Sequence, residues 1–269
     1  MFGSVRPAGA ATLILGLLAS APSYGQSFWT GRSIGDGITL EVVRPDLKDV
    51  ELTSPSLAYY ISLRHALSPA VRLVGELPFS YVGFEDEALD EDHGGMLIGN
   101  PYLGAEYTPE SFFSLEAGFR LPLTDDSKWR MLGMYGDIDR IDAFQDVTPI
   151  YSRANFRWAL PDSRVAVRLN AGPSVWLQSG DDPDVLLGYG GQLWYQGGSF
   201  EVGTGLSGLF IATTSGSVGE RSWHQLGFSA DVVSGSVRPG VNLRLPIGEN
   251  MNDVLTYSLG LHVTIPARR

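Results

Sequence analysis

Arginine and glutamate side chains recur at every second position of segments that are otherwise apolar. Within residues 112–123, for example, Glu116 and Arg120 alternate with Leu115 and Phe119. Successive side chains of an extended strand point to opposite faces, so this spacing gathers the charges on one face. Guanidinium and carboxylate groups on such a face could orient a polar or anionic solute, or they could pair with one another as a structural network.

The elements that would position these charges are long strands. The alternation within 112–123 persists for about eleven residues, whereas an ordinary strand has about five or six, and a strand that crosses a bilayer needs about nine to eleven. Similar alternation recurs along the chain, in residues 38–42, 57–64, 71–81, 97–107, 150–160, 165–178, 187–196, 200–210, 223–232, 237–247 and 255–265. The sequence therefore predicts an all-β chain that forms a single transmembrane antiparallel β-barrel of about 12 strands.

The connections between these segments alternate in character. Those after the second, fourth, sixth, eighth and tenth segments are tight and rich in Pro, Gly, Ser and Asp, whereas the others are mostly longer and more polar. Short periplasmic turns and longer outer loops are typical of bacterial outer-membrane barrels. This order predicts that both termini are periplasmic.

The apolar rows are expected to face lipid. They often end in Phe, Tyr or Trp, as the aromatic girdles of membrane barrels do, and the polar rows carry Arg, Glu, Asn and Gly. Lysine, which is common on wetted protein surfaces, is limited to Lys48 and Lys128. A soluble β-sandwich or soluble barrel is the alternative interpretation of the same alternation.

The polar rows would then line the lumen. The predicted pore-lining residues are Arg64, Arg72, Glu76, Glu106, Glu116, Arg120, Arg153, Arg157, Arg168, Trp176, Trp194, Arg238 and Arg244. Further acids are expected on this face at Glu41, Glu201 and Asp231, so the two signs nearly balance, as in a salt-bridged plug. The same charges could instead set the ion selectivity of a pore, and inward aromatic rings could hold a solute or only fill space.

Residues 1–25 have the pattern of a secretory signal peptide, which leaves a barrel of residues 26–269. Arg6 precedes an apolar run that is too short to span a membrane as a helix, and small residues at Ser23 and Gly25 precede the expected cleavage before Gln26. The chain has no cysteine, and its net charge of −11 without basic clusters argues against a nucleic-acid partner. The expected partners are outer-membrane lipids, lipopolysaccharide and a small solute, without a cofactor or metal.

Two connections carry unusual residues. The break at residues 124–147 is long enough to be functional, and it could fold inward as a constriction or cap the outer mouth. The acidic loop Glu85–Asp92 could bind divalent cations beside lipopolysaccharide, but it lacks the spacing of an EF-hand, and a solvated charged loop is the favoured interpretation. None of the four histidines has the His–Ser spacing of a lipid-hydrolysing barrel, so an enzyme is not predicted.

Four short segments resemble the outer-membrane proteins grouped as the "MetA-pathway of phenol degradation" family. They are Pro55–Tyr60, Leu77–Phe79, Gly99–Tyr107 and Leu121–Thr124, which match the order of that family's strand-end motifs. The chain departs from the pattern at Asn100, where Asp is usual. The resemblance implies a transport channel in the outer membrane and no defined catalytic residues.

The prediction is therefore an outer-membrane β-barrel that acts as a passive channel for small polar or anionic organic solutes through a mixed Arg/Glu lumen. The alternative is a non-conducting structural or adhesive barrel whose lumen is closed by salt bridges. The sequence leaves open the solute, the position of residues 124–147 and the oligomeric state.

Overall fold

The computed structural model describes residues 36–48, 56–86, 91–124, 131–178, 180, 182–233 and 235–267. The predicted signal peptide, residues 1–25, lies outside the described residues, as do Lys128 and the tip of the acidic loop at residues 87–90.

Strands make up nearly all of the regular structure. They are β1 (Gly37–Leu47), β2 (Leu57–Ala66), β3 (Val71–Asp86), β4 (Glu91–Ile98), β5 (Tyr102–Glu110), β6 (Phe113–Arg120), β7 (Thr148–Ala159), β8 (Val165–Leu177), β9 (Asp184–Gln196), β10 (Phe200–Ile211), β11 (Ser222–Val232), β12 (Arg238–Ile247) and β13 (Leu255–Pro266).

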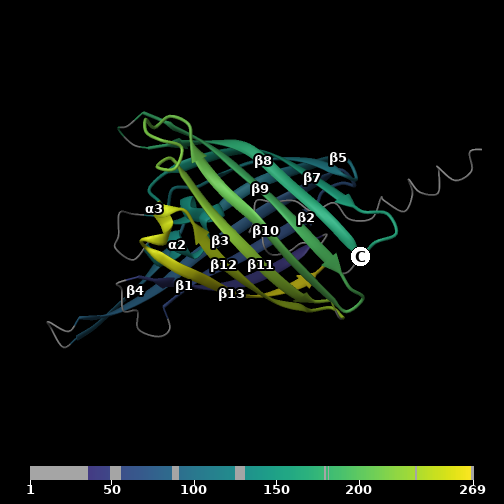
Figure 1. The fold of residues 1–269 in the computed structure, drawn as a ribbon, viewed down its shortest axis with the longest axis horizontal. Coiled ribbons are helices and arrows are strands. Elements are labelled where there is room, and N and C mark those ends of the chain that lie inside the picture. Colours follow the sequence, from purple (N-terminus) through teal and green to yellow (C-terminus); the bar gives the residue numbers. More distant parts are fainter. Residues whose placement is uncertain are drawn as a thin grey trace, which may run out of the picture.

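These thirteen strands form one antiparallel sheet that closes on itself (Figure 1). Strands that are neighbours in sequence pair with each other, except β4 and β5, which both pair with β3; β3 also pairs with β2, and β1 pairs with β13. β5 pairs with the first half of β3 and β4 pairs with the second half, so β4 and β5 together occupy one strand position in the wall. The thirteen strands therefore make a wall of twelve strand positions. The pairing of β1 with β13 closes the wall, as a barrel in lipid requires, although among the described residues the β3–β4 hairpin keeps an unpaired edge on β4; the predicted all-β barrel is confirmed.

The two ends of the barrel differ as the connections predict. The turns after β2, β5, β7, β9 and β11 are short and lie at the end where β1 begins and β13 finishes, on the right of Figure 1. The opposite end carries the longer connections, the helices and the projecting β3–β4 hairpin. Both ends of the described chain lie at the short-turn end, as expected for a barrel whose short turns are periplasmic.

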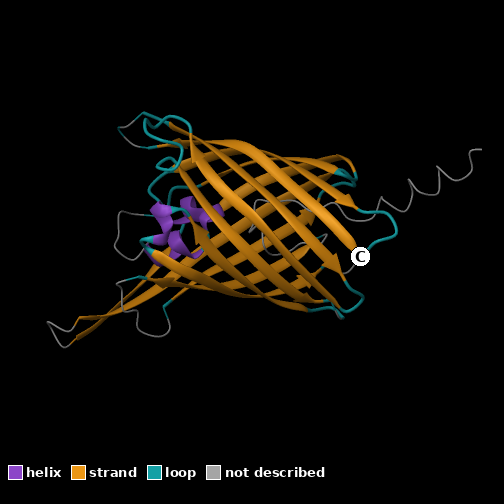
Figure 2. Cartoon of the chain, viewed as in Figure 1, coloured by secondary structure: helices purple, strands orange, loops and turns teal. Residues whose placement is uncertain are grey.

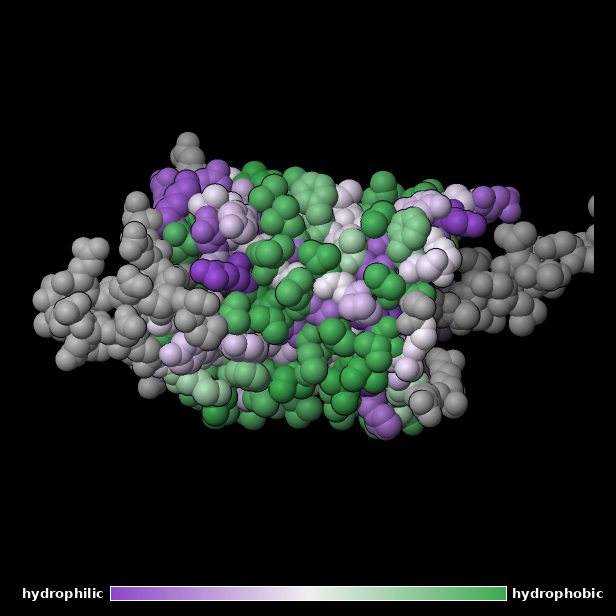
Figure 3. Space-filling model, turned by 90° about the horizontal axis from the view of Figure 1, so that it is seen from below, coloured by the Kyte–Doolittle hydropathy of each residue, from purple (hydrophilic) through white to green (hydrophobic). Residues whose placement is uncertain are grey.

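The alternation of residue types becomes an inside and an outside. On β1, Ile38 and Leu40 are more than 40% exposed on the outer surface, whereas Thr39 is 5% exposed and Glu41 is 3% exposed. Other strands repeat this order, with Leu169 at 43% and Arg168 at 0% on β8. Figure 3 shows apolar residues along much of the barrel wall, with polar residues gathered near its ends.

The helices occupy the end with long connections (Figure 2). They are α2 (Met131–Gly136), the short 3-10 helix η2 (Ile138–Phe144) and α3 (Glu249–Asn252). No helix among the described residues has both the length and the apolar character needed to cross a membrane.

Three local expectations were wrong. The strand within residues 112–123 ends at Arg120. The Leu121 amide still donates to the Pro101 carbonyl in the register of β5, but Pro101 has no N–H to return the bond, and the Leu123 and Thr124 amides donate to the Asn100 side chain. The other two concern the face of the sheet on which a side chain lies.

Leu97 and Leu255 were expected to face lipid, and both face inward. Between β5 and β4 the register against β3 shifts by one residue, from Glu76↔Tyr102 to Phe79↔Ile98, so β4 presents the opposite row. A bulge near the start of β13 does the same for Leu255, which is 3% exposed. Both leucines pack in apolar clusters of the lumen.

Candidate functional site

Residues 131–147 fold into the lumen, and we call this segment the plug. Figure 2 shows its helices inside the rim of the barrel. Leu132, Ile138 and Phe144 are fully buried, and the plug packs against wall residues in two apolar clusters. The absence of a side chain at Gly133 lets the Phe144 ring lie directly on the backbone of α2, since a Cβ there would stand 2.3 Å from the ring. The sequence leaves open whether this segment folds inward or caps the outer mouth, and in the structure it folds inward.

Arg140 lies at the centre of the charges that hold the plug. Its guanidinium contacts Glu41 on β1 at 2.5 Å, Glu76 on β3 at 3.2 Å and Asp137 of the plug itself at 2.9 Å. The guanidinium carbon also lies 3.5 Å from the centroid of the Tyr60 ring. Each of these side chains is buried, so the charges compensate one another in place of water.

Two wall arginines complete this network. Arg244 on β12 contacts Glu41 at 2.7 Å and Asp137 at 3.4 Å. On the other side of the plug, Arg120 on β6 contacts Glu76 at 2.8 Å and Asp142 at 3.2 Å. Charged wall residues from β1, β3, β6 and β12 thus tie the plug to one side of the lumen.

Asn100 holds the plug through its amide group. The nitrogen donates to the carbonyl oxygens of Asp142 at 3.0 Å and Gln145 at 2.6 Å. The oxygen accepts from the amides of Leu123 and Thr124, both at 2.9 Å. One side chain therefore joins the β4–β5 junction, the exit from β6 and the plug.

Burial and charge act differently on two carboxylates of the plug. Burial, together with the neighbouring Asp137, raises the pKa of Asp139 to about 7. Burial alone would also raise the pKa of Asp137, but Arg244 and Arg140 outweigh it, and its pKa lies below the usual value. Asp137 therefore stays ionised at neutral pH, whereas Asp139 changes its charge near neutral pH.

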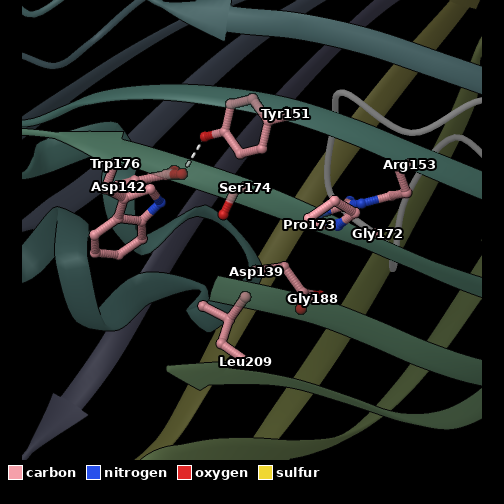
Figure 4. Close-up of a pocket in the computed structure, with 10 residues that line it drawn as sticks. All are labelled: Asp139, Asp142, Tyr151, Arg153, Gly172, Pro173, Ser174, Trp176, Gly188 and Leu209. Atoms are coloured by element: carbon pink, nitrogen blue, oxygen red, sulfur yellow. Dashed lines mark hydrogen bonds between the residues drawn. The ribbon is translucent and has the colours of Figure 1, made fainter. Parts of the chain in front are cut away.

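A narrow gap remains between the plug and the wall formed by β7, β8, β9 and β10 (Figure 4). It has room for about one water molecule. It is lined by Asp139, Asp142, Tyr151, Arg153, Gly172, Pro173, Ser174, Trp176, Gly188 and Leu209. The Tyr151 hydroxyl donates to the Asp142 carboxylate along one edge. We call this space the side gap.

The predicted pore-lining residues lie on the inward rows of their strands, and the structure divides them into groups. Glu76, Arg120 and Arg244 contact the plug, while Arg153 and Trp176 line the side gap. Towards the short-turn end, Glu106 contacts Arg64 at 3.4 Å and Arg72 at 3.0 Å, and Arg168 donates to Gln192 at 3.0 Å. The remaining members also occupy wall strands: Glu116 on β6, opposite Arg153; Arg157 on β7; Trp194 on β9; and Arg238 on β12.

Sequence reasoning missed Arg140, the residue with the most ionic partners in the plug. The long connection is predicted to be functional, but it has no alternation with period two that assigns a direction to any of its side chains. A signal does exist, because Ile138 and Ile141 flank a lone arginine among three aspartates. Apolar residues next to an isolated cation in an otherwise acidic loop indicate a segment that is buried with its counter-charges.

No family model and no curated protein matches the chain. Among solved structures it is similar to an outer membrane channel from Pseudomonas putida, with 14% identity, a TM-score of 0.56, and coverage of 90% of this chain and 99% of that one. The NanC porin has 8% identity and a TM-score of 0.54, covering 86% and 100% of the two chains. The beta domain of the Bordetella autotransporter BrkA has 13% identity and a TM-score of 0.51, covering 87% and 100%.

The chain has the fold of the outer-membrane β-barrels. Identities this low establish the fold alone, and the three similar structures include a channel, a porin and an autotransporter domain. Function must therefore be argued from the lumen of this chain.

Proposed function

We propose that this protein resides in the bacterial outer membrane and acts as a passive channel for small polar or anionic organic solutes. The observation that carries the proposal is the asymmetry of the plug. Ion pairs tie it to β1, β3, β6 and β12, whereas its contacts with β7–β10 are apolar packing and single hydrogen bonds from Tyr151 and Ser207, with the side gap among them. A passage beside a fixed inward segment is how a barrel of this width can admit small solutes and hold back large ones.

The sequence supports the location. A signal peptide at residues 1–25 would export the chain, and the exposed apolar rows fit a lipid environment. The resemblance of residues 55–124 to the "MetA-pathway of phenol degradation" family points to transport as well. We propose no enzymatic activity, no cofactor and no nucleic-acid partner.

Charge determines which solutes the side gap favours. Arg153 is its basic lining residue, and it lies opposite Glu116 in the β6–β7 register. Two acids of the plug, Asp139 and Asp142, share the lining, but Asp142 is already paired with Arg120, and Asp139 has a raised pKa. We propose that this arginine, which interacts electrostatically with Glu116, Asp139 and Asp142, also attracts anions to the gap.

Reversal potentials across planar bilayers test this proposal with the purified full chain. We expect a small conductance in the wild type, and Arg153→Ser should shift selectivity towards cations. The shift should shrink at high salt, because ions screen the charge. Arg164→Ser, on an exposed turn, is the matched control and should leave selectivity unchanged. A wild type without conductance would contradict the proposal.

A non-conducting structural or adhesive barrel is the second candidate. It is favoured by the network around Arg140, in which all the interacting carboxylates are buried and paired. This candidate predicts intact barrels in the bilayer with no measurable conductance at any salt concentration.

A further inference from the structure

We infer that the outer face of β1 is a binding site for lipid A, the phosphorylated disaccharide that anchors lipopolysaccharide in the outer leaflet. The residues that would recognise it are Arg44, Asp46 and Lys48. This inference rests on the proposed location in the outer membrane. It does not rest on the proposed channel, because these side chains lie on the outside of the barrel and not in the lumen.

Three successive outward positions near the end of β1 carry charge. The outward row of this strand begins at the short-turn end with apolar residues, among them Ile38 and Leu40. It continues with Arg44 and Asp46 and then, directly after the strand, with Lys48, and all three are exposed. In a barrel whose short turns are periplasmic, this second half of the row lies in the outer leaflet.

The neighbours of these charges on the outer surface are apolar or aromatic. Arg44 lies opposite Leu259 of β13, and Asp46 lies opposite Tyr257. Both neighbours face outward, with exposed fractions of 44% and 39%. Within the described residues, neither Arg44 nor Lys48 has an ion-pair partner. A cation that faces lipid is more costly the deeper it lies, so an anion at this level would stabilise the wall.

The spacing of the charges fits lipid A. Arg44 and Lys48 are four positions apart, which is about 13 Å along an extended strand. Lipid A carries a phosphate at each end of its disaccharide, so each phosphate can meet one basic side chain. Asp46 lies midway, where the sugars offer hydroxyl and amide donors to a carboxylate. The tilt of the strand places Arg44 deeper than Lys48, and its long side chain can extend to the headgroup level.

The outer surface deeper in the bilayer suits the acyl chains of the same lipid. Leu40 and Val42 continue the outward row of β1, and Leu261 of β13 lies opposite Val42. Leu261 is 60% exposed. The face therefore presents charge at the headgroup level and apolar side chains beneath it, which is the order of groups in an anionic lipid.

A second copy of the chain is the competing occupant of this face. Around a twofold axis along the membrane normal, Arg44 of each barrel could meet Asp46 of the other. The described outward row of β1 carries two cations and one acid, so such an interface would leave Lys48 unpaired. Two phosphates match both cations, so the charges fit the lipid better than a second copy.

Native mass spectrometry tests the inference on the purified protein, refolded in detergent without lipopolysaccharide. The probes are lipid A with two phosphates, lipid A with one phosphate, and phosphatidylglycerol. We expect the two-phosphate form to bind most tightly. Arg44→Gln and Lys48→Gln should each weaken its binding about fivefold, because a basic residue beside an anionic headgroup contributes about that factor. Arg164→Gln, on an exposed turn at the other end of the barrel, is the matched control and should bind as the wild type does.

Asp46→Asn separates the lipid from a second copy. The amide keeps an acceptor for the sugars and removes a charge that repels the phosphates, so lipid A should bind at least as tightly. Equal binding of the three lipids, or unchanged binding in both Arg44→Gln and Lys48→Gln, would overturn the inference. Dimers that form without lipid and disappear in Asp46→Asn would also overturn it.

This site and the channel fail separately. Conductance in planar bilayers without a preference for two-phosphate lipid A overturns the inference and leaves the channel intact. That preference without conductance supports the site and overturns the channel.

Discussion

Arg140 balances the charge of the plug, because its guanidinium contacts Glu41, Glu76 and Asp137. Arg140→Met keeps much of the side-chain volume and leaves these carboxylates short of a cation. Removing one partner of a buried ion pair costs about 3–5 kcal/mol. We expect the free energy of unfolding to fall by about this amount in urea denaturation from lipid vesicles. Arg164→Met, on an exposed turn, is the control, and equal losses at both positions would show that Arg140 does not hold the plug.

Asp139 should make stability depend on pH. Burial and Asp137 raise its pKa to about 7 from 3.8, so the folded state binds more protons than the unfolded state between these values. Stability from this group is therefore lost as pH rises from about 4 to about 7. The charged groups that face it are Asp137, Arg153 and Arg244. Asp139→Asn should flatten this part of the stability profile, measured by thermal unfolding at a series of pH values, and an unchanged slope would refute the assignment.

At the scale of elements, the sequence predicts strands better than their irregularities. Strict alternation with period two located all twelve wall positions, and residues such as Leu169 and Arg168 face as expected. It failed at Leu97 and Leu255, because a one-residue shift in register reverses the facing, and that shift depends on partner strands that lie far away in sequence. Nor does alternation place the plug, whose position depends on counter-charges from several strands.

The junction between β4 and β5 is the element on which we expect the plug to depend most. The Asn100 amide forms hydrogen bonds to Asp142, Gln145, Leu123 and Thr124. Asn100→Ala leaves several buried backbone groups without partners and should destabilise the protein by about 2 kcal/mol or more. Equilibrium unfolding in urea measures the loss. Asn170→Ala, at a buried position on β8, is the matched control, and a loss at Asn100 no greater than at Asn170 would contradict this role.

At the scale of the whole molecule, the plug closes one side of the barrel lumen more tightly than the other. Charges on β1, β3, β6 and β12 bind the plug directly, and the side gap lies against β7–β10. In the proposed channel, the wall provides the closed and lipid-compatible scaffold, and the plug determines what can pass through it. We propose that solutes pass between the plug and β7–β10.

The most direct test is the accessibility of a cysteine placed in the side gap. The chain has no cysteine of its own, so Gly188→Cys introduces a single thiol, and Gly198→Cys, in the turn between β9 and β10, is the control. Single-channel conductance would be recorded before and after a small anionic methanethiosulfonate reagent is added. We expect the wild type to conduct. The conductance of Gly188→Cys should fall after the reagent is added, and that of Gly198→Cys should stay the same. A wild type that does not conduct, or a conductance unaffected by modification of Gly188→Cys, would contradict it.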